Sequence, residues 1–106
     1  MDKRKVIEIV GRFHQKIQAL GIRPQKIILY GSYAAGNAAS DSDIDIVVIS
    51  DDFVGKGYWE RIDILADVIY DLFEPIEAVA MTCEEWERGD SVITQYASNG
   101  EVLFAA

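Results

Sequence analysis

The sequence predicts an α/β fold, a mixed β-sheet of about four strands flanked by helices. Apolar residues recur at helical spacing in residues 6–20 and 58–74. Between and after these segments lie short apolar runs of the kind that form buried strands, at residues 26–30, 43–49, 75–81 and 101–104. With 106 residues, half of them hydrophobic, a single domain spanning 1–106 is expected.

The first element is expected to be an amphipathic helix that ends at Gly21. Its apolar positions at helical spacing are Val6, Ile7, Val10, Phe13, Ile17 and Leu20. His14 is expected to face solvent or a partner, because no second histidine exists to share a metal.

The strand at 26–30 leads into Gly31 and Ser32. Gly31 lets a ligand approach the backbone because glycine has no side chain, and Ser32 adds a hydroxyl and an N–H. Residues 32–39 are small and are predicted to form a short helix whose first N–H groups face a bound phosphate.

Asp43 and Asp45 open the next strand and point to the same side, because side chains alternate along a strand. Their separation of roughly 6.5 Å implies a repulsion of about 2 to 3 kcal/mol at an effective dielectric near 20. Mg²⁺ is commonly held by one or two carboxylates together with substrate phosphates, so the pair favours a site for a nucleoside triphosphate. The alternative is that residues 40–43 form a solvated loop that enters a strand.

Two related motifs are excluded. The spacing of Asp41, Asp43 and Asp45 resembles the start of a calcium loop, but Ile46 stands where that loop needs Gly and Asp52 where it needs Glu. No Gly-Lys-Ser/Thr phosphate loop occurs anywhere in the chain.

After a loop at 51–57, the longest helix is predicted from Tyr58 to Glu74, stopped by Pro75. Its inner face is expected to contain Ile62, Leu65, Ile69, Leu72 and Phe73. An acidic stripe follows on one side, made of Glu60, Asp63, Asp67, Asp71 and Glu74. The stripe is interpreted as a solvated face or one packed near the basic first helix, or alternatively as a docking surface for a basic partner.

Glu77 is the only acid inside the third strand. A lone carboxylate among apolar residues is costly unless it is paired or binds a metal, and the alternative is a rim position that faces water. Beyond this strand, Thr82 and Glu85 form a capping box for a short helix. A last helix from Ser91 to Ser98, capped by Asp90 or Ser91, and a strand at 101–104 end the pattern.

The turn at Gly31-Ser32 followed by Asp43-Ile44-Asp45 resembles the signature of the minimal nucleotidyltransferases of the DNA polymerase beta superfamily. The resemblance implies the polymerase-beta-like fold, with Gly31 and Ser32 contacting the nucleotide phosphates. It also implies two Mg²⁺ ions bound by Asp43 and Asp45, with a third acid on a later strand.

Glu77 is the candidate for that third acid, as metal ligand or base, where the family usually has Asp. A second departure is Tyr33 and Ala35, which stand where many relatives have Arg. The longer side chain of Glu77 bears on metal geometry or base position, and so more on catalysis than on nucleotide binding. Without the arginines, the turn brings less positive charge to the phosphates.

Family members of this size are often antitoxins paired with a helical HEPN-domain ribonuclease, and some adenylylate a tyrosine of that partner. The resemblance therefore implies Mg-dependent transfer of AMP from ATP to a hydroxyl, with Asp43, Asp45 and Glu77 as catalytic residues. The alternative is a non-catalytic antitoxin that neutralises its partner by forming a complex. An antibiotic-modifying enzyme is disfavoured, because little sequence follows the third strand to enclose a small acceptor.

The net charge of −8 argues against tight non-specific nucleic-acid binding, although seven of the ten basic residues fall within residues 1–26. The single cysteine, Cys83, excludes an internal disulfide, and its neighbours Glu84 and Glu85 are expected to raise its pKa. No signal or membrane-spanning segment is seen, so a soluble cytoplasmic protein is expected, as a homo-oligomer or in a complex that presents the acceptor.

Overall fold

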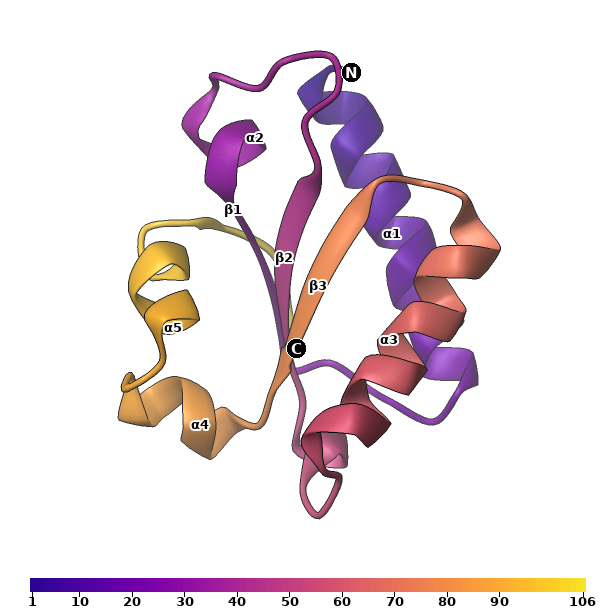
Figure 1. Cartoon of the computed structure of the whole chain (residues 1–106), viewed down its shortest axis with the longest axis vertical. Coiled ribbons are helices and arrows are strands. Elements are labelled where there is room, and N and C mark those ends of the chain that lie inside the picture. Colours follow the sequence, from indigo (N-terminus) through magenta and orange to yellow (C-terminus); the bar gives the residue numbers. More distant parts are fainter.

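The computed structural model describes residues 1–106 and contains one mixed sheet with the strand order β3-β2-β1-β4 (Figure 1). The strands are β1 (Lys26–Tyr30), β2 (Ile44–Ile49), β3 (Ile76–Met81) and β4 (Glu101–Ala105). The helices are α1 (Lys3–Ala19), α2 (Gly31–Ala35), η1 (Asp51–Phe53), α3 (Tyr58–Leu72), α4 (Cys83–Arg88) and α5 (Val92–Ala97). β1 is antiparallel to β2 and β4, whereas β2 and β3 are parallel. The predicted fold class is confirmed.

The parallel pairing of β2 and β3 follows from the long helix between them, since parallel strands need a crossover connection. Helices α1 and α3 lie side by side on one face of the sheet, and α4 and α5 lie toward the other face (Figure 1). No helix is long and apolar enough to cross a lipid bilayer.

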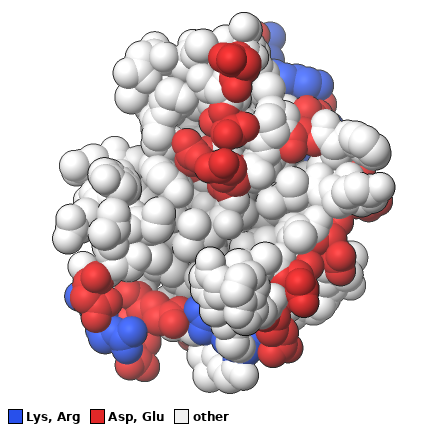
Figure 2. All heavy atoms as spheres, in the orientation of Figure 1, with Lys and Arg blue, Asp and Glu red and all other residues white.

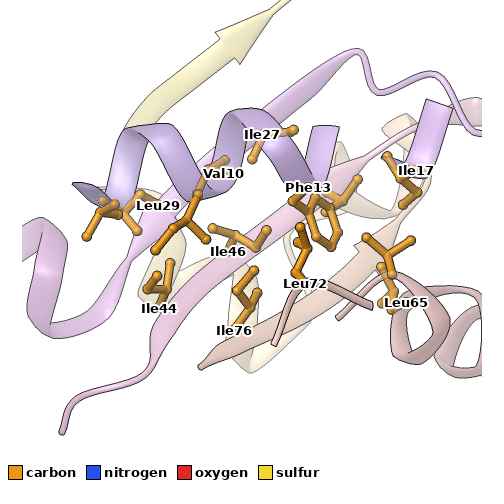
Figure 3. Packing of buried hydrophobic residues seen from close by; sticks show 14 of the residues in the cluster. Val10, Phe13, Ile17, Ile27, Leu29, Ile44, Ile46, Leu65, Leu72 and Ile76 are labelled. Atoms are coloured by element: carbon orange, nitrogen blue, oxygen red, sulfur yellow. The ribbon is translucent and has the colours of Figure 1, made fainter. Parts of the chain in front are cut away.

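The main core lies between the sheet and the pair α1 and α3. Phe13 and Ile17 of α1 meet Ile46 of β2 and Leu65 and Leu72 of α3, and these side chains are almost or entirely shielded from water (Figure 3). A smaller cluster on the opposite face contains Ile28, Val47, Ile49, Met81 and Ala97. β2 therefore contributes alternate residues to both clusters and is buried on both sides.

The predicted face of α1 is wrong at two positions. Ile7 is 48% exposed and Leu20 is 52% exposed, whereas Ile9 is fully buried. Ile7 lies about 100° around the helix from Val6, so it leaves the face that meets the sheet. Leu20 is the C-cap residue of α1, where the helical backbone ends, and its side chain is directed toward solvent.

The predicted end of α3 is also wrong. The helix stops at Leu72, and Phe73 adopts a left-handed conformation with φ 55° that leaves its ring 85% exposed. Val68 joins the buried face instead. The left-handed turn before Pro75 reverses the chain toward β3 and directs Phe73 away from the core.

Two short segments differ from their predictions. α2 is shorter than residues 32–39, because Gly36 ends it in a left-handed conformation with φ 82°. The segment expected as a loop at 51–57 begins with the helical turn η1. The capping box of Thr82 and Glu85 is confirmed, and the cap of α5 is Ser91 rather than Asp90.

His14 lies in an environment that the sequence did not indicate. Its ring packs edge-on against Phe104 of β4, with the ring centroids 4.1 Å apart, and its Nε2 is buried without a hydrogen-bond partner. Burial lowers its pKa. His14 is therefore half-buried against β4 rather than fully solvated, and a contact with a partner stays a prediction.

The C-terminal part of the acidic stripe packs beside the basic first helix. Asp71 lies 2.8 Å from Lys16, and Glu74 lies 3.3 Å from Arg12. The other three acids, Glu60, Asp63 and Asp67, have no ion pair. The interpretation that the stripe packs near the basic first helix is thus confirmed for its C-terminal part only.

The corrected face of α1 can be tested by unfolding in urea. Phe13→Ala should lower the free energy of unfolding by about 3 to 5 kcal/mol, because it leaves a cavity in the main core. The matched control Ile7→Ala should cost less than about 1 kcal/mol, since half of that side chain already contacts water. Equal losses in the two variants would contradict the observed orientation of α1.

Candidate functional site

Three carboxylates meet where β2 and β3 begin. Asp45 and Glu77 are direct partners in the parallel register of the two strands, and Asp43 lies two residues before Asp45. Figure 2 shows acidic side chains gathered over this end of the sheet. Asp43 lies just before β2 rather than opening it as predicted, but its charge acts on Asp45, so the structure brings the three acids singled out in the sequence near one another.

Electrostatic crowding among these groups is strongest at Asp45. Burial, followed by the nearby charges of Glu77 and Asp43 and a hydrogen bond with Glu77, raises the pKa of Asp45 to about 6. Tyr30, which pairs with Asp45 from the other side in the register of β1, has its pKa raised by burial and by the charges of Asp45 and Glu77. Asp45 thus lies at the centre of a negatively charged cluster.

The predicted glycine turn lies directly against this cluster. Gly31 has a φ of 73°, and a Cβ atom built there would collide with the carboxylate of Asp45. Only glycine combines this left-handed backbone with so close an approach. Ser32 follows in the first turn of α2 and is half-buried. The Gly31-Ser32 turn and the aspartates, which are separated in sequence, therefore form one site.

The donor set fits a divalent cation that is shared with a phosphate ligand. Nowhere in the chain do three His, Cys, Asp or Glu side chains come close enough together to hold a metal by themselves. Mg²⁺ needs no such cage, because it is usually bound through one or two carboxylates plus substrate phosphates and water. Asp43, Asp45 and Glu77 are the residues that would hold it, and their mutual repulsion is what a cation would relieve.

Arg61 is an important residue whose role the sequence did not reveal. Its guanidinium lies 2.6 Å from Glu85 and donates a hydrogen bond to the carbonyl oxygen of Lys56. Burial alone would raise the pKa of Glu85, but the bonds from Arg61 and Thr82 hold it below its usual range. Arg61 thus connects α3 to the start of α4. The one sequence signal for a special role of Arg61 was that it is the only cation in an otherwise acidic helix.

Cys83 has a raised pKa, as the sequence predicted, but the cause is different. Burial contributes most, followed by Asp51, which accepts a hydrogen bond from the backbone N–H of Cys83, and by the charge of Glu87. The adjacent Glu84 and Glu85 are not among the causes. A raised pKa disfavours the reactive thiolate.

Comparison with known proteins identifies the family. The nucleotidyltransferase domain model matches residues 3–98, so the chain belongs to the nucleotidyltransferase domain family. Two Methanocaldococcus jannaschii proteins, both provisionally named as protein adenylyltransferases, are similar to it. One is 37% identical over 70 residues, which is 65% of this chain and 47% of the relative; the other is 42% identical over 52 residues, 48% of this chain and 49% of the relative. The chain spans about half the length of these curated relatives.

Solved structures show the same fold at low sequence identity. A provisionally assigned nucleotidyltransferase from Sulfolobus solfataricus superposes with a TM-score of 0.70 at 13% identity, over 92% of this chain and 78% of that one. A toxin-antitoxin structure with AMP-PNP superposes with a TM-score of 0.62 at 24% identity, over 89% of this chain and 72% of that one. These likenesses support the polymerase-beta-like fold.

The contact between Gly31 and Asp45 yields a matched test on two glycines. Gly31→Ala and Gly36→Ala each force alanine into a left-handed conformation, which costs about 1 to 2 kcal/mol. Gly31→Ala should cost about 1 to 2 kcal/mol more in urea unfolding, because only there does the new methyl group meet a neighbour. In an Asp45→Ala background that excess should vanish. A persistent excess would show that the turn does not pack on Asp45.

The raised pKa of Asp45 also predicts how stability depends on pH in metal-free buffer. The folded state binds this proton more tightly than the unfolded chain, so the stabilisation is present at low pH and is lost as the pH rises from about 4 through about 6. At pH 7 the free energy of unfolding of Asp45→Asn should therefore exceed that of wild type by about 1 to 2 kcal/mol, a figure that allows for solvent screening. At pH 4 the two should differ little. Urea unfolding with EDTA at both pH values measures it. The same difference at both pH values would refute the shift.

Proposed function

We propose that this protein is a nucleotidyltransferase that binds Mg-ATP and transfers AMP to a hydroxyl group of a partner protein. The observation that carries the proposal is the packing of the Gly31 turn against Asp45, with Asp43 and Glu77 beside it. The names of the Methanocaldococcus jannaschii relatives support protein adenylylation as the reaction. The toxin-antitoxin structure with AMP-PNP supports an ATP-like substrate and an antitoxin context.

The proposed reaction is a displacement at the α-phosphorus of ATP. The acceptor oxygen forms a bond to that phosphorus, the bond to the β-phosphate oxygen breaks, and pyrophosphate leaves. The acceptor proton passes to Glu77 or to water. Bound Mg²⁺, in two positions, would supply positive charge to the attacking and leaving oxygens.

The residues of this chain would bind and orient the nucleotide. Gly31 allows phosphate oxygens to reach the backbone N–H groups of the turn, and Ser32 adds a hydroxyl donor. Asp43 and Asp45 hold the cation from the β2 side, and Glu77 does so from β3. In line with the family resemblance, the acceptor would be a tyrosine of a HEPN-domain toxin, which would make this chain its antitoxin.

The competing function is a non-catalytic antitoxin that keeps nucleotide affinity and neutralises its partner by covering it. Glu77 in place of the usual Asp, and the absence of Arg at Tyr33 and Ala35, favour this second candidate. The two candidates differ in whether AMP is transferred.

Nucleotide binding should be visible in thermal melts. Mg-ATP at about a hundredfold excess over its dissociation constant should stabilise the native state by roughly 2 to 3 kcal/mol, because it binds the folded chain only. The double variant Asp43→Asn, Asp45→Asn should lose this gain. An equal gain in the double variant would place nucleotide binding elsewhere on the protein.

Transfer of label from α-labelled ATP to the partner protein tests the chemistry. Glu77→Gln should reduce transfer at least about a hundredfold, because a metal ligand or proton acceptor is lost, while nucleotide affinity falls much less. If Glu77→Gln transfers label at the wild-type rate, Glu77 is a water-facing residue at the rim of the site and neither a metal ligand nor a base. If wild type binds Mg-ATP and suppresses its partner without any label transfer, the non-catalytic candidate is correct.

A further inference from the structure

The edge of the sheet beside the site is open. β3 is an edge strand: it pairs along its full length with its one neighbour, β2, and no strand lies on its other side. The carbonyl oxygens of Pro75 and Met81 accept bonds from Ile44 and Ser50 at the two ends of this pairing. Because backbone groups alternate in direction along a strand, the N–H and C=O groups of Ala78 and Ala80 point away from the sheet. No side chain hydrogen-bonds to them.

The open edge lies in a groove of about 590 Å³ between α3 and α4. Tyr58, Ile62 and Leu65 line it on one side and Glu85 and Arg88 on the other, with residues 78–81 also contributing. Tyr58 packs edge-on against Trp59, and the two rings are 69% and 73% exposed. Such a groove combines unpaired backbone groups with one apolar wall and one charged wall.

The two edge strands of the sheet differ in protection. β4 contains Glu101, which forms an ion pair with Lys3, and its register with β1 is irregular between Ile27 and Ile28. Charges and irregularities of this kind prevent an edge from pairing with another chain. β3 has no charge after Glu77, no proline and no irregular register. An unprotected edge of six residues is suited to strand addition.

Charge around the groove selects the kind of segment that fits. Arg61 is paired with Glu85, and Arg88 with Glu84 and Asp90, so only Lys56 lacks an acidic partner among the cations of the groove. At the start of β3, next to the groove, Glu77 has no ion pair, and its charge and that of Asp43 act on Asp45. A second copy of this chain, with its own net charge of −8, would be repelled. A cationic segment would be attracted.

We propose that the free edge of β3 docks an extended, cationic segment of the acceptor protein, which adds to the sheet as a fifth strand. This inference rests on the proposed function, and it names how the acceptor is held. Glu77 begins the same strand, so a segment paired with Ala78 and Ala80 runs directly to the carboxylate cluster. Main-chain bonds would supply affinity, and the carboxylate cluster at the start of β3, together with the net charge of −8, would select a cationic segment.

The probe is a seven-residue peptide that alternates lysine and valine and has a tyrosine at one end, added to the protein with Mg-ATP. Amide hydrogen exchange measured by NMR should slow at least about tenfold at Ala78 and Ala80, while the amide of Val79, already bonded to β2, stays protected throughout. A matched peptide with proline in place of each valine keeps the charge but cannot form a strand, and it should give no protection.

A pair of charge variants tests the selectivity. Asp90→Lys, which changes an acid that lines the groove, should weaken peptide binding about three- to tenfold and reduce its salt dependence. Glu8→Lys on α1, an equal change in net charge away from β3, should not. The proposal is overturned if the peptide fails to bind at millimolar concentration, or if protection appears at other amides. It is also overturned if the free protein is a dimer in which Ala78 and Ala80 are already protected.

The exchange measurement detects docking of the peptide whether or not AMP is transferred to it. Protection of Ala78 and Ala80 without label transfer to the peptide tyrosine would support the docking site and remove the proposed transfer. Label transfer without that protection would keep the transfer and remove the docking site.

Discussion

Burial of β2 on both faces is the constraint on which the rest of the structure depends. Ile44, Ile46 and Val48 belong to the core under α1 and α3, while Val47 and Ile49 belong to the cluster on the opposite face. A strand fixed on both sides cannot slip by one residue without exposing one apolar set and burying polar groups in its place. The position of Asp45 is therefore set by the hydrophobic packing of its neighbours.

The site is the polar end of this buried strand. Asp45 takes part in the β2–β3 pairing with Glu77 and the β1–β2 pairing with Tyr30, so its carboxylate is held where negative charge is crowded and water is partly excluded. The Gly31 turn closes the site from the end of β1. Hydrophobic stabilisation of the sheet thus offsets the electrostatic cost of a site that favours a cation and a phosphate.

The same architecture leaves β3 at an edge. The α3 crossover places β3 beside β2 in parallel, and no later segment returns to cover its outer side, because β4 pairs with β1 at the opposite edge. Arg61 and Glu85 connect α3 to the start of α4, and both line the groove beside β3. The carboxylate cluster and the open edge are in this sense two consequences of one strand order.

The sequence by itself determined the α/β class, the order of the strands and main helices along the chain, and the residues of the candidate site. It could do so because apolar periodicity, the Gly31-Ser32 turn and the spacing of Asp43 and Asp45 are local properties. Only the tertiary structure decided that Gly31 packs on Asp45, that Phe73 turns outward, that His14 meets Phe104, and that Arg61 binds Glu85. Each of these depends on contacts between segments far apart in the chain, or on a backbone reversal imposed by them, and no local pattern encodes such contacts.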